Sequence, residues 1–320
     1  MRILEKIILD KKFLAGIAII LFLVVFFFSF FPEAERLEFK IVEISPGITA
    51  EGVARVLRDN GLIRNVGYFL FLAKLRNATN RLQSGIYKFY LGMSYHEIIQ
   101  MLIKGKTLKT KLTVPEGFTA SQIAELIQER KLGSEEIFLQ IAKDKEWEGF
   151  LFPETYYISP GMTEEEIGNL MINQFNKIFT DQMRERGRQL KLKIKEVITL
   201  ASMIEKEAKK DEERELVSAV FHNRLKKRMY LESCATILYA LGRYKEKLRY
   251  KDLKVDSPYN TYTHFGLPPG PICNPGLKSI MAALYPTDSD VLFFVVDKGS
   301  GSHIFSRYYG EHLDVQKKRR

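Results

Sequence analysis

The sequence lacks the short motifs that identify several large enzyme classes. It contains no Gly-x-Ser-x-Gly nucleophile turn, no Walker phosphate-binding loop and no Gly-x-Gly-x-x-Gly dinucleotide motif. Its five histidines do not have the spacing of metal ligands. We therefore expect neither a metal site nor a bound cofactor, and the chemistry must come from ordinary side chains.

Cysteine is scarce, since Cys234 and Cys273 are the only two in the chain. In an oxidising compartment the two thiols could form a disulfide. They could equally be two buried thiols, and the sequence leaves both interpretations open.

Charged residues are missing from residues 13–31. As a helix this run would be about 28 Å long, which matches the hydrocarbon core of a bilayer, and Pro32 would end it. Arg2, Lys6, Lys11 and Lys12 precede the run, and such a bias keeps the N-terminus in the cytoplasm. We predict a cytoplasmic tail at 1–12, a transmembrane helix at 13–31 in contact with inner-membrane lipid, and a linker at 32–38. The rest of a single-pass chain would then lie outside the cytoplasmic membrane.

The formal charge of +10 is concentrated partly at the C-terminus, where residues 315–320 form a basic tail that we expect to be solvated. The remaining basic excess suits an anionic partner such as a cell-wall polymer or a lipid surface. Nucleic acid is not an expected partner, because most of the chain is predicted to lie outside the cytoplasm.

Three segments repeat the same local pattern. Predicted strands at 39–44, 85–90 and 110–114 are each followed by a glycine turn and then by apolar residues at helical spacing. Thr49, Ser94 and Thr119 stand where a helix N-cap is expected. Such βα units resemble the LysM type of glycan-binding module, although plain βα packing is the alternative. We predict a small LysM-like βα subdomain at 39–110.

The remainder, 111–314, is predicted to be one catalytic domain of mixed helix and strand. Helical patterns cover 119–130, 134–143, 163–186, 193–209, 211–229 and 277–284, and strand patterns cover 291–296 and 303–305. This mixture is typical of the α+β fold class.

Glu205 lies where a helix pattern predicts an apolar residue. At about 100° per residue, it falls between Ala201 and Ile198 in the apolar arc of the helix, whereas Lys206 falls on the opposite face. A carboxyl group in an apolar wall is costly to ionise, and a general acid must hold its proton near neutral pH.

The main alternative for Glu205 is a buried salt bridge, with Arg224 on the next helix as the natural partner. Glu207 lies at the edge of the arc and is a secondary candidate. The acidic residues at 211–215 are predicted to form a solvated helix start.

A second candidate region is the stretch at 257–276, which is rich in proline and glycine and is predicted to be a stiff loop. Asn260 and Tyr262 lie on it, and amide and aromatic side chains on a stiff loop suit carbohydrate. A purely structural loop would have the same composition.

Several stretches together resemble the endolytic murein transglycosylase family, the YceG-like proteins. They are LTVPEG at 112–117, FLFPETY at 150–156, ASMIEKE at 201–207, VFHNRL at 220–225, YNTY at 259–262, GLPPGPI at 266–272 and GSHIF at 301–305. The resemblance covers nearly the whole region after the apolar run, in the family's order. One departure is Cys234, which stands where some members have an aspartate, so an acidic role at that position is in doubt. If Cys234 pairs with Cys273, the bridge would join two loops near the site.

The resemblance implies cleavage of peptidoglycan glycan strands between N-acetylmuramic acid (MurNAc) and N-acetylglucosamine (GlcNAc), leaving a 1,6-anhydro end. It implies that Glu205 is the catalytic residue. The residues expected to bind substrate around it are Asn223, Arg224, Glu232, Thr236, Asn260, Tyr262 and His303. It also implies association with cell-wall synthesis proteins.

A single carboxyl group suffices for this chemistry, because the attacking hydroxyl belongs to the sugar itself. Two alternatives remain from the residues alone. One is a glycan-binding scaffold without activity. The other is a hydrolase that uses Glu205 with Glu207 or Glu154, since hydrolytic glycosidases usually need two carboxylates.

Overall fold

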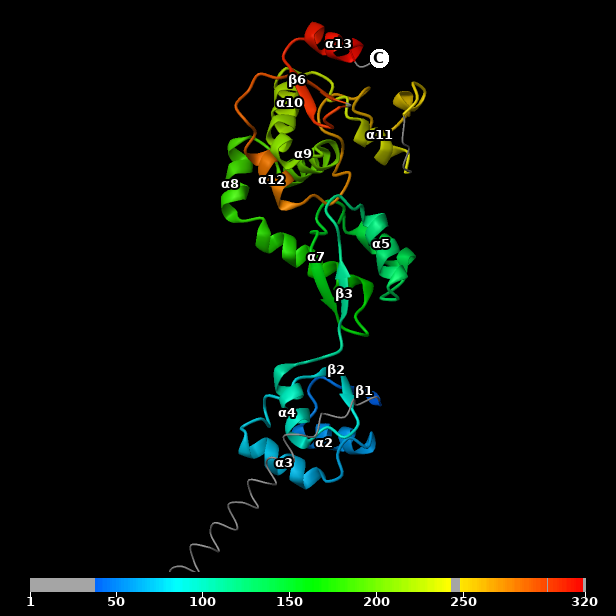
Figure 1. Ribbon diagram of the computed structural model, residues 1–320, viewed down its shortest axis with the longest axis vertical. Coiled ribbons are helices and arrows are strands. Elements are labelled where there is room, and N and C mark those ends of the chain that lie inside the picture. The colour runs from blue at the N-terminus through cyan, green and yellow to red at the C-terminus, as the bar shows by residue number, and fades with distance from the viewer. Residues whose placement is uncertain (1–37, 243–247, 298, 319–320) are drawn as a thin grey trace, which may run out of the picture. The chain divides into compact units, whose positions relative to one another are not determined.

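The computed structural model describes residues 38–242, 248–297 and 299–318. These residues form two compact units, the first ending at Leu108 and the second beginning at Lys109. Each unit is described here by itself (Figure 1).

The first unit begins with β1 (Phe39–Ile44), α2 (Ala50–Asp59), α3 (Val66–Leu75) and β2 (Gly85–Tyr90), and α4 (Tyr95–Lys104) follows. The two strands pair antiparallel, with Phe39 opposite Tyr90 and Ile44 opposite Gly85. The helices bury their apolar faces against the inner face of this ribbon, where Tyr87 and Phe89 are fully buried. A two-stranded ribbon is only marginally stable on its own, so the helices supply most of the core.

Helix starts in this unit and the next follow the predicted caps. The side chain of Thr49 accepts a hydrogen bond from the Gly52 N–H, and Ser94 and Thr119 each form a capping box with the residue three positions on. The three predicted N-caps are therefore confirmed, because each satisfies an amide that the first turn leaves without a partner.

The second unit contains two cores. The first joins the antiparallel pair β3 (Thr110–Thr113) and β4 (Thr155–Ile158) to α5 (Ala120–Glu129), α6 (Glu135–Asp144) and α7 (Glu164–Ile178). The second core surrounds α9 (Ile194–Glu207), which contacts the helices α8 (Asp181–Gln189), α10 (Arg214–Lys226), α11 (Cys234–Ala240) and α12 (Leu277–Leu284) (Figure 1).

The remaining elements of the second unit are short. They are the 3-10 turns η1 (Asp211–Glu213) and η2 (Asp252–Lys254), the antiparallel strands β5 (Phe293–Val296) and β6 (His303–Ser306), and α13 (Tyr309–Lys317). The Phe294 ring of β5 packs edge-on against Phe221 of α10, which places this ribbon against the second core.

The predicted architecture needs two corrections, and the first concerns the transmembrane helix. Across 38–242, 248–297 and 299–318, no helix has both the length and the apolar character required to cross a membrane. Even α7 has only 15 residues, whereas a span needs about 20. The α+β mixture is as expected, but a fold containing a transmembrane helix is wrong for the described chain. The predicted span at 13–31, the tail at 1–12 and the linker up to residue 37 lie outside the described residues.

The single helix predicted at 163–186 is also wrong. The chain leaves the helical conformation at Phe179, and Thr180 starts α8 by accepting a hydrogen bond from the Met183 N–H. A buried Phe179 and a threonine cap thus divide the segment into two helices.

Candidate active site

Glu205 lies in the last turn of α9, where its helix packs against α12 and α10. Its side chain is 8% exposed and that of Arg214 is 10% exposed. One carboxylate oxygen lies 3.2 Å from a guanidinium nitrogen of Arg214, and the other accepts a hydrogen bond of 3.0 Å from the Gly276 N–H. Glu205 is therefore ion-paired, but with Arg214 and not with the predicted Arg224.

Arg214 holds three groups together around this carboxylate. It donates to the Asp211 carboxylate at 3.0 Å and to the Ser279 hydroxyl at 2.6 Å, besides its contact with Glu205. Asp211 also pairs with Lys278 at the surface. Hydrogen bonds from Lys278 and Arg214 lower the pKa of Asp211, so this acid stays ionised and fixes the guanidinium.

Glu116 is the second carboxyl group beside Glu205, and the sequence did not single it out. A Cβ atom at Gly276 would lie 1.9 Å from a Glu116 carboxylate oxygen, while the Gly276 amide bonds Glu205, so the two acids flank this glycine. Partial burial, and then the negative charge of Glu205, raise the pKa of Glu116. Two signals pointed to this region: Pro115 and Gly117 mark a turn, and Glu116 lies in the LTVPEG stretch that resembles the family, but neither shows which residues the turn faces.

The two carboxylates proposed as alternatives lie elsewhere. Glu207 accepts hydrogen bonds from the Ser233 hydroxyl at 2.5 Å and the Ala235 N–H at 3.4 Å, so it serves the start of α11. Glu154 is exposed and accepts from the Thr155 N–H at 3.0 Å. Neither makes a hydrogen bond with Glu205.

Asn223 and Arg224 make hydrogen bonds within the fold, and the exposed Glu232 pairs with Arg224. Arg224 is buried and donates to the carbonyl oxygens of residues 230, 231 and 292 and to the Glu232 carboxylate at 2.8 Å. Asn223 donates to the carbonyl oxygens of residues 289 and 291. These hydrogen bonds anchor the segment before β5, and a substrate contact by the three residues stays a prediction.

Thr236 and Asn260 are fully buried in a second network. The Asn260 amide donates to the carbonyl oxygens of residues 253 and 255 and accepts from the Tyr262 N–H. Thr236 lies 3.0 Å from the Thr261 hydroxyl. These buried hydrogen bonds hold the stiff loop in place. Tyr262 is partly buried, whereas Thr236 and Asn260 are fully buried.

The remaining predicted residues are also paired. His303 is buried, with its Nδ1 2.6 Å from the carboxylate of Glu213, which the sequence had assigned to a solvated turn. Cys234 and Cys273 are both free thiols. The Cys234 sulfur lies 3.2 Å from the Tyr262 hydroxyl, and Cys273 donates to the Ser202 carbonyl, so the structure contains no bridge between the two cysteines.

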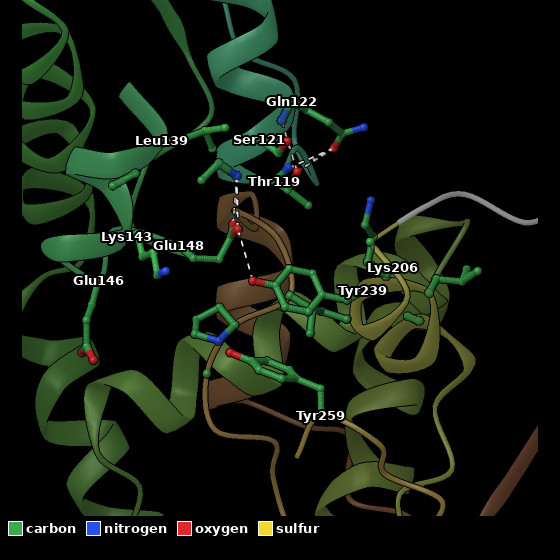
Figure 2. Close-up of a pocket in the computed structure, with 18 of the residues that line it drawn as sticks. Thr119, Ser121, Gln122, Leu139, Lys143, Glu146, Glu148, Lys206, Tyr239 and Tyr259 are labelled. Carbon is green, nitrogen blue, oxygen red and sulfur yellow. Dashed lines mark hydrogen bonds between the residues drawn. The ribbon is translucent and has the colours of Figure 1, made fainter. Parts of the chain in front are cut away.

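A cavity of about 970 Å³ opens in the second unit between α5, α6, α9, α11 and the loop at 259–272. Figure 2 shows Glu148 pointing into it toward the Tyr239 hydroxyl, with Tyr259 below and Lys206 at the side. The size is that of a small-molecule site. Glu205, Asn260 and Tyr262 do not line this cavity, although Lys206 follows Glu205 directly.

Glu148 is partly buried, whereas Glu125 and Glu146, the other acids that line the cavity, are exposed. Burial raises the pKa of Glu148 to about 7, although hydrogen bonds from the Ala120 N–H and the Tyr239 hydroxyl act in the opposite direction. It lies two residues before the FLFPETY stretch, and the sequence analysis did not identify it. Gly149 follows it with φ of +90°, and a Cβ atom there would lie 2.3 Å from Pro271.

Comparison with known proteins gives consistent matches over most of the chain. The chain is 34% identical over 304 residues to an endolytic murein transglycosylase of Bacillus subtilis (strain 168), covering 87% of this chain and 84% of that protein. It is 30% identical over 325 residues to an endolytic murein transglycosylase of Streptococcus pneumoniae (strain ATCC BAA-255 / R6), covering 88% of this chain and 58% of the relative.

A solved structure matches as well. The crystal structure of a yceG-like protein from Listeria monocytogenes superposes with a TM-score of 0.59 at 34% identity, covering 87% of this chain and 98% of that one. The model of the YceG-like family matches residues 42–318. The chain therefore belongs to the YceG-like family.

Proposed function

We propose that this chain is an endolytic murein transglycosylase, which cleaves the glycan strand of peptidoglycan between MurNAc and GlcNAc and leaves a 1,6-anhydro-MurNAc end. The observation that carries the proposal is the family match over residues 42–318, together with the name of the Bacillus relative. Because peptidoglycan lies outside the cytoplasm, the second unit acts there.

Glu205 is proposed as the acid and then the base of the reaction. Protonated, it gives its proton to the glycosidic oxygen as the C1–O bond breaks, so GlcNAc leaves with a free 4-hydroxyl. The ionised carboxylate then takes the proton of the MurNAc O6 hydroxyl, whose oxygen bonds to C1 of the same sugar. No water is consumed, and Glu205 ends protonated as it began.

The surroundings of Glu205 support the second step of this role, in which its ionised carboxylate acts as the base. Arg214 and the Gly276 N–H both contact the carboxylate and balance its charge. Glu116 is the adjacent carboxyl group, and burial and the charge of Glu205 raise its pKa. Substrate must reach the open edge beside Glu116, which is exposed.

The first unit is proposed to hold the glycan strand. A cavity of about 450 Å³ lies between the β1–α2 turn and the segment before β2, and Thr49 and Asn80 are among the polar residues that line it. Hydroxyl and amide groups at a shallow site suit sugar hydroxyls. The LysM-like assignment and an association with cell-wall synthesis proteins stay predictions.

The test is digestion of purified peptidoglycan followed by mass spectrometry of the products. Wild-type protein should release muropeptides with anhydro ends, and Glu205→Gln should lower their rate of formation by at least about 100-fold, the usual contribution of a general acid–base group. Glu154→Gln is the matched control on an exposed acid and should retain activity.

Other outcomes identify the alternatives. Reducing ends in place of anhydro ends would indicate a two-carboxylate hydrolase. Binding to peptidoglycan without any product would indicate a scaffold. Either result with folded wild-type protein would overturn the proposed function.

A further inference from the structure

The cavity beside Glu148 is not used by the mechanism above. It combines a partly buried acid with two aromatic rings, and the rings of Tyr239 and Tyr259 lie 4.9 Å apart at 49° to each other. Figure 2 shows the two rings and the Glu148 carboxyl group facing the same space. Aromatic faces with a few fixed polar groups are the lining that suits a sugar ring.

Glu148 is held in one position by groups from three segments. Both carboxyl oxygens lie 3.2 Å from the Ala120 N–H at the start of α5. One accepts from the Asn274 amide at 3.2 Å, and the other is 3.5 Å from the Tyr239 hydroxyl. A fixed carboxyl group of this kind is ready to contact a ligand without reordering.

A structural role as a helix cap explains Glu148 incompletely. The start of α5 already has a cap, because the Thr119 hydroxyl accepts from the Gln122 N–H and Gln122 accepts from the Thr119 N–H. Glu148 adds one further acceptor for Ala120. An amide side chain would accept that bond equally well without the desolvation cost of a buried acid.

We propose that this cavity is a binding subsite for an N-acetylated sugar of the glycan strand, in which the neutral Glu148 carboxyl group donates a hydrogen bond to the sugar. A neutral acid carries one O–H donor, whereas the carboxylate only accepts. The acetamido oxygen and the ring hydroxyls of such a sugar are acceptors. The proposal rests on the proposed function, and it makes Glu148 a substrate-positioning residue that is distinct from Glu205.

The groups that face Glu148 leave it as the one expected to titrate near pH 7. Burial raises the pKa of the Tyr239, Tyr259 and Cys273 side chains above their ordinary values. The other ionisable groups that line the cavity are exposed at its rim: Glu125 on α5, Lys143 on α6, Glu146, and Lys195 and Lys206 on α9. Glu146 pairs with Lys195 at 3.1 Å, so these two compensate each other.

The experiment follows kcat/KM for anhydro-end formation from pH 5 to pH 9 with the full chain. In the wild type, the neutral fraction of a group with a pKa of about 7 falls about tenfold between pH 6 and pH 8, and kcat/KM should fall with it. Glu148→Gln keeps a donor at every pH, so it should remove that alkaline decrease while it retains activity at pH 6. Glu129→Gln, the same change on the exposed end of α5, should keep the wild-type profile.

Further measurements separate the explanations. Glu148→Ala removes the donor and should raise KM at least about tenfold at pH 6, where the wild-type acid is neutral, and by much less at pH 9, with a smaller effect on kcat and with circular dichroism used to check folding. A Glu148→Gln profile that coincides with the wild type would overturn the subsite while leaving the proposed function intact. The absence of anhydro ends from the wild type would instead overturn the proposed function. If Glu148→Ala does not fold, the comparison of kcat/KM against pH between the wild type and Glu148→Gln still tests the subsite.

Discussion

Two acids of the second unit, Glu205 and Glu148, have opposite kinds of hydrogen-bond partners. Glu205 receives a guanidinium group and a backbone N–H, so its negative charge is balanced where it lies. Glu148 receives only neutral donors at hydrogen-bond distance, and burial raises its pKa to about 7. The comparison teaches that two partly buried acids in one unit can receive different partners, a cation for Glu205 and only neutral donors for Glu148.

The largest expected effect comes from removing the partner of Glu205. Arg214→Met leaves Glu205, Asp211 and Ser279 without their shared donor, and should lower the free energy of unfolding by about 3–5 kcal/mol. Denaturant unfolding measures this. Lys278→Met, which removes the other, exposed partner of Asp211, should have a much smaller effect. Equal effects of the two changes would contradict a special role for the buried pair.

The pH dependence of stability should report on Glu148. The folded-state pKa of Glu148 is raised from 4.5 to about 7, so its neutral form favours folding below pH 4.5 and this contribution is lost as the pH rises through 7. Relative to Glu148→Gln, the wild type should lose at most about 3 kcal/mol across that range. Thermal unfolding at pH 5 and pH 8 checks the sign, and parallel curves for the two proteins would contradict it.

Two glycines next to the acids should respond differently to alanine. At Gly149 the added Cβ would meet the Pro271 ring at 2.3 Å with φ of +90°, and the protein should lose about 1–3 kcal/mol of stability. At Gly276 the added Cβ meets only the movable end of Glu116. Gly276→Ala should therefore change stability by less than about 1 kcal/mol but reduce anhydro-end formation. Chemical denaturation and product assays on both variants test this contrast.

The smallest expected effect concerns Tyr239. Its hydroxyl lies 3.5 Å from Glu148 and acts to lower the pKa of that carboxyl group. Tyr239→Phe should therefore raise the pKa of Glu148 slightly and change stability by less than about 0.5 kcal/mol. An NMR titration of the Glu148 carboxyl carbon would detect the direction, and a downward change would be inconsistent with the hydrogen bond.

The sequence predicted local features better than it predicted partners. The caps at Thr49, Ser94 and Thr119 were recognisable because the bonds they make lie within four residues along the chain. A salt bridge was the alternative considered for Glu205, with Arg224 as its partner, but the actual partner Arg214 lies in an acidic run that looked solvated.

Partners that come from distant segments gave no signal. Glu116 reaches Gly276 across the fold, and Glu148 meets Asn274 and Tyr239 only after the two cores of the second unit form. Periodicity describes one face of one element, whereas the charge state of an acid depends on what the other elements bring to it.

The buried side chain of Asn274 should affect how the second unit unfolds. Its side chain is completely enclosed and accepts from the Leu151 N–H while donating to the Phe118 carbonyl and to Glu148. One amide thus fastens the region of the β3–β4 ribbon to the chain that wraps α9. Heat or urea should accordingly unfold both regions in a single cooperative transition, and the cavity beside Glu148 should be lost in that same step.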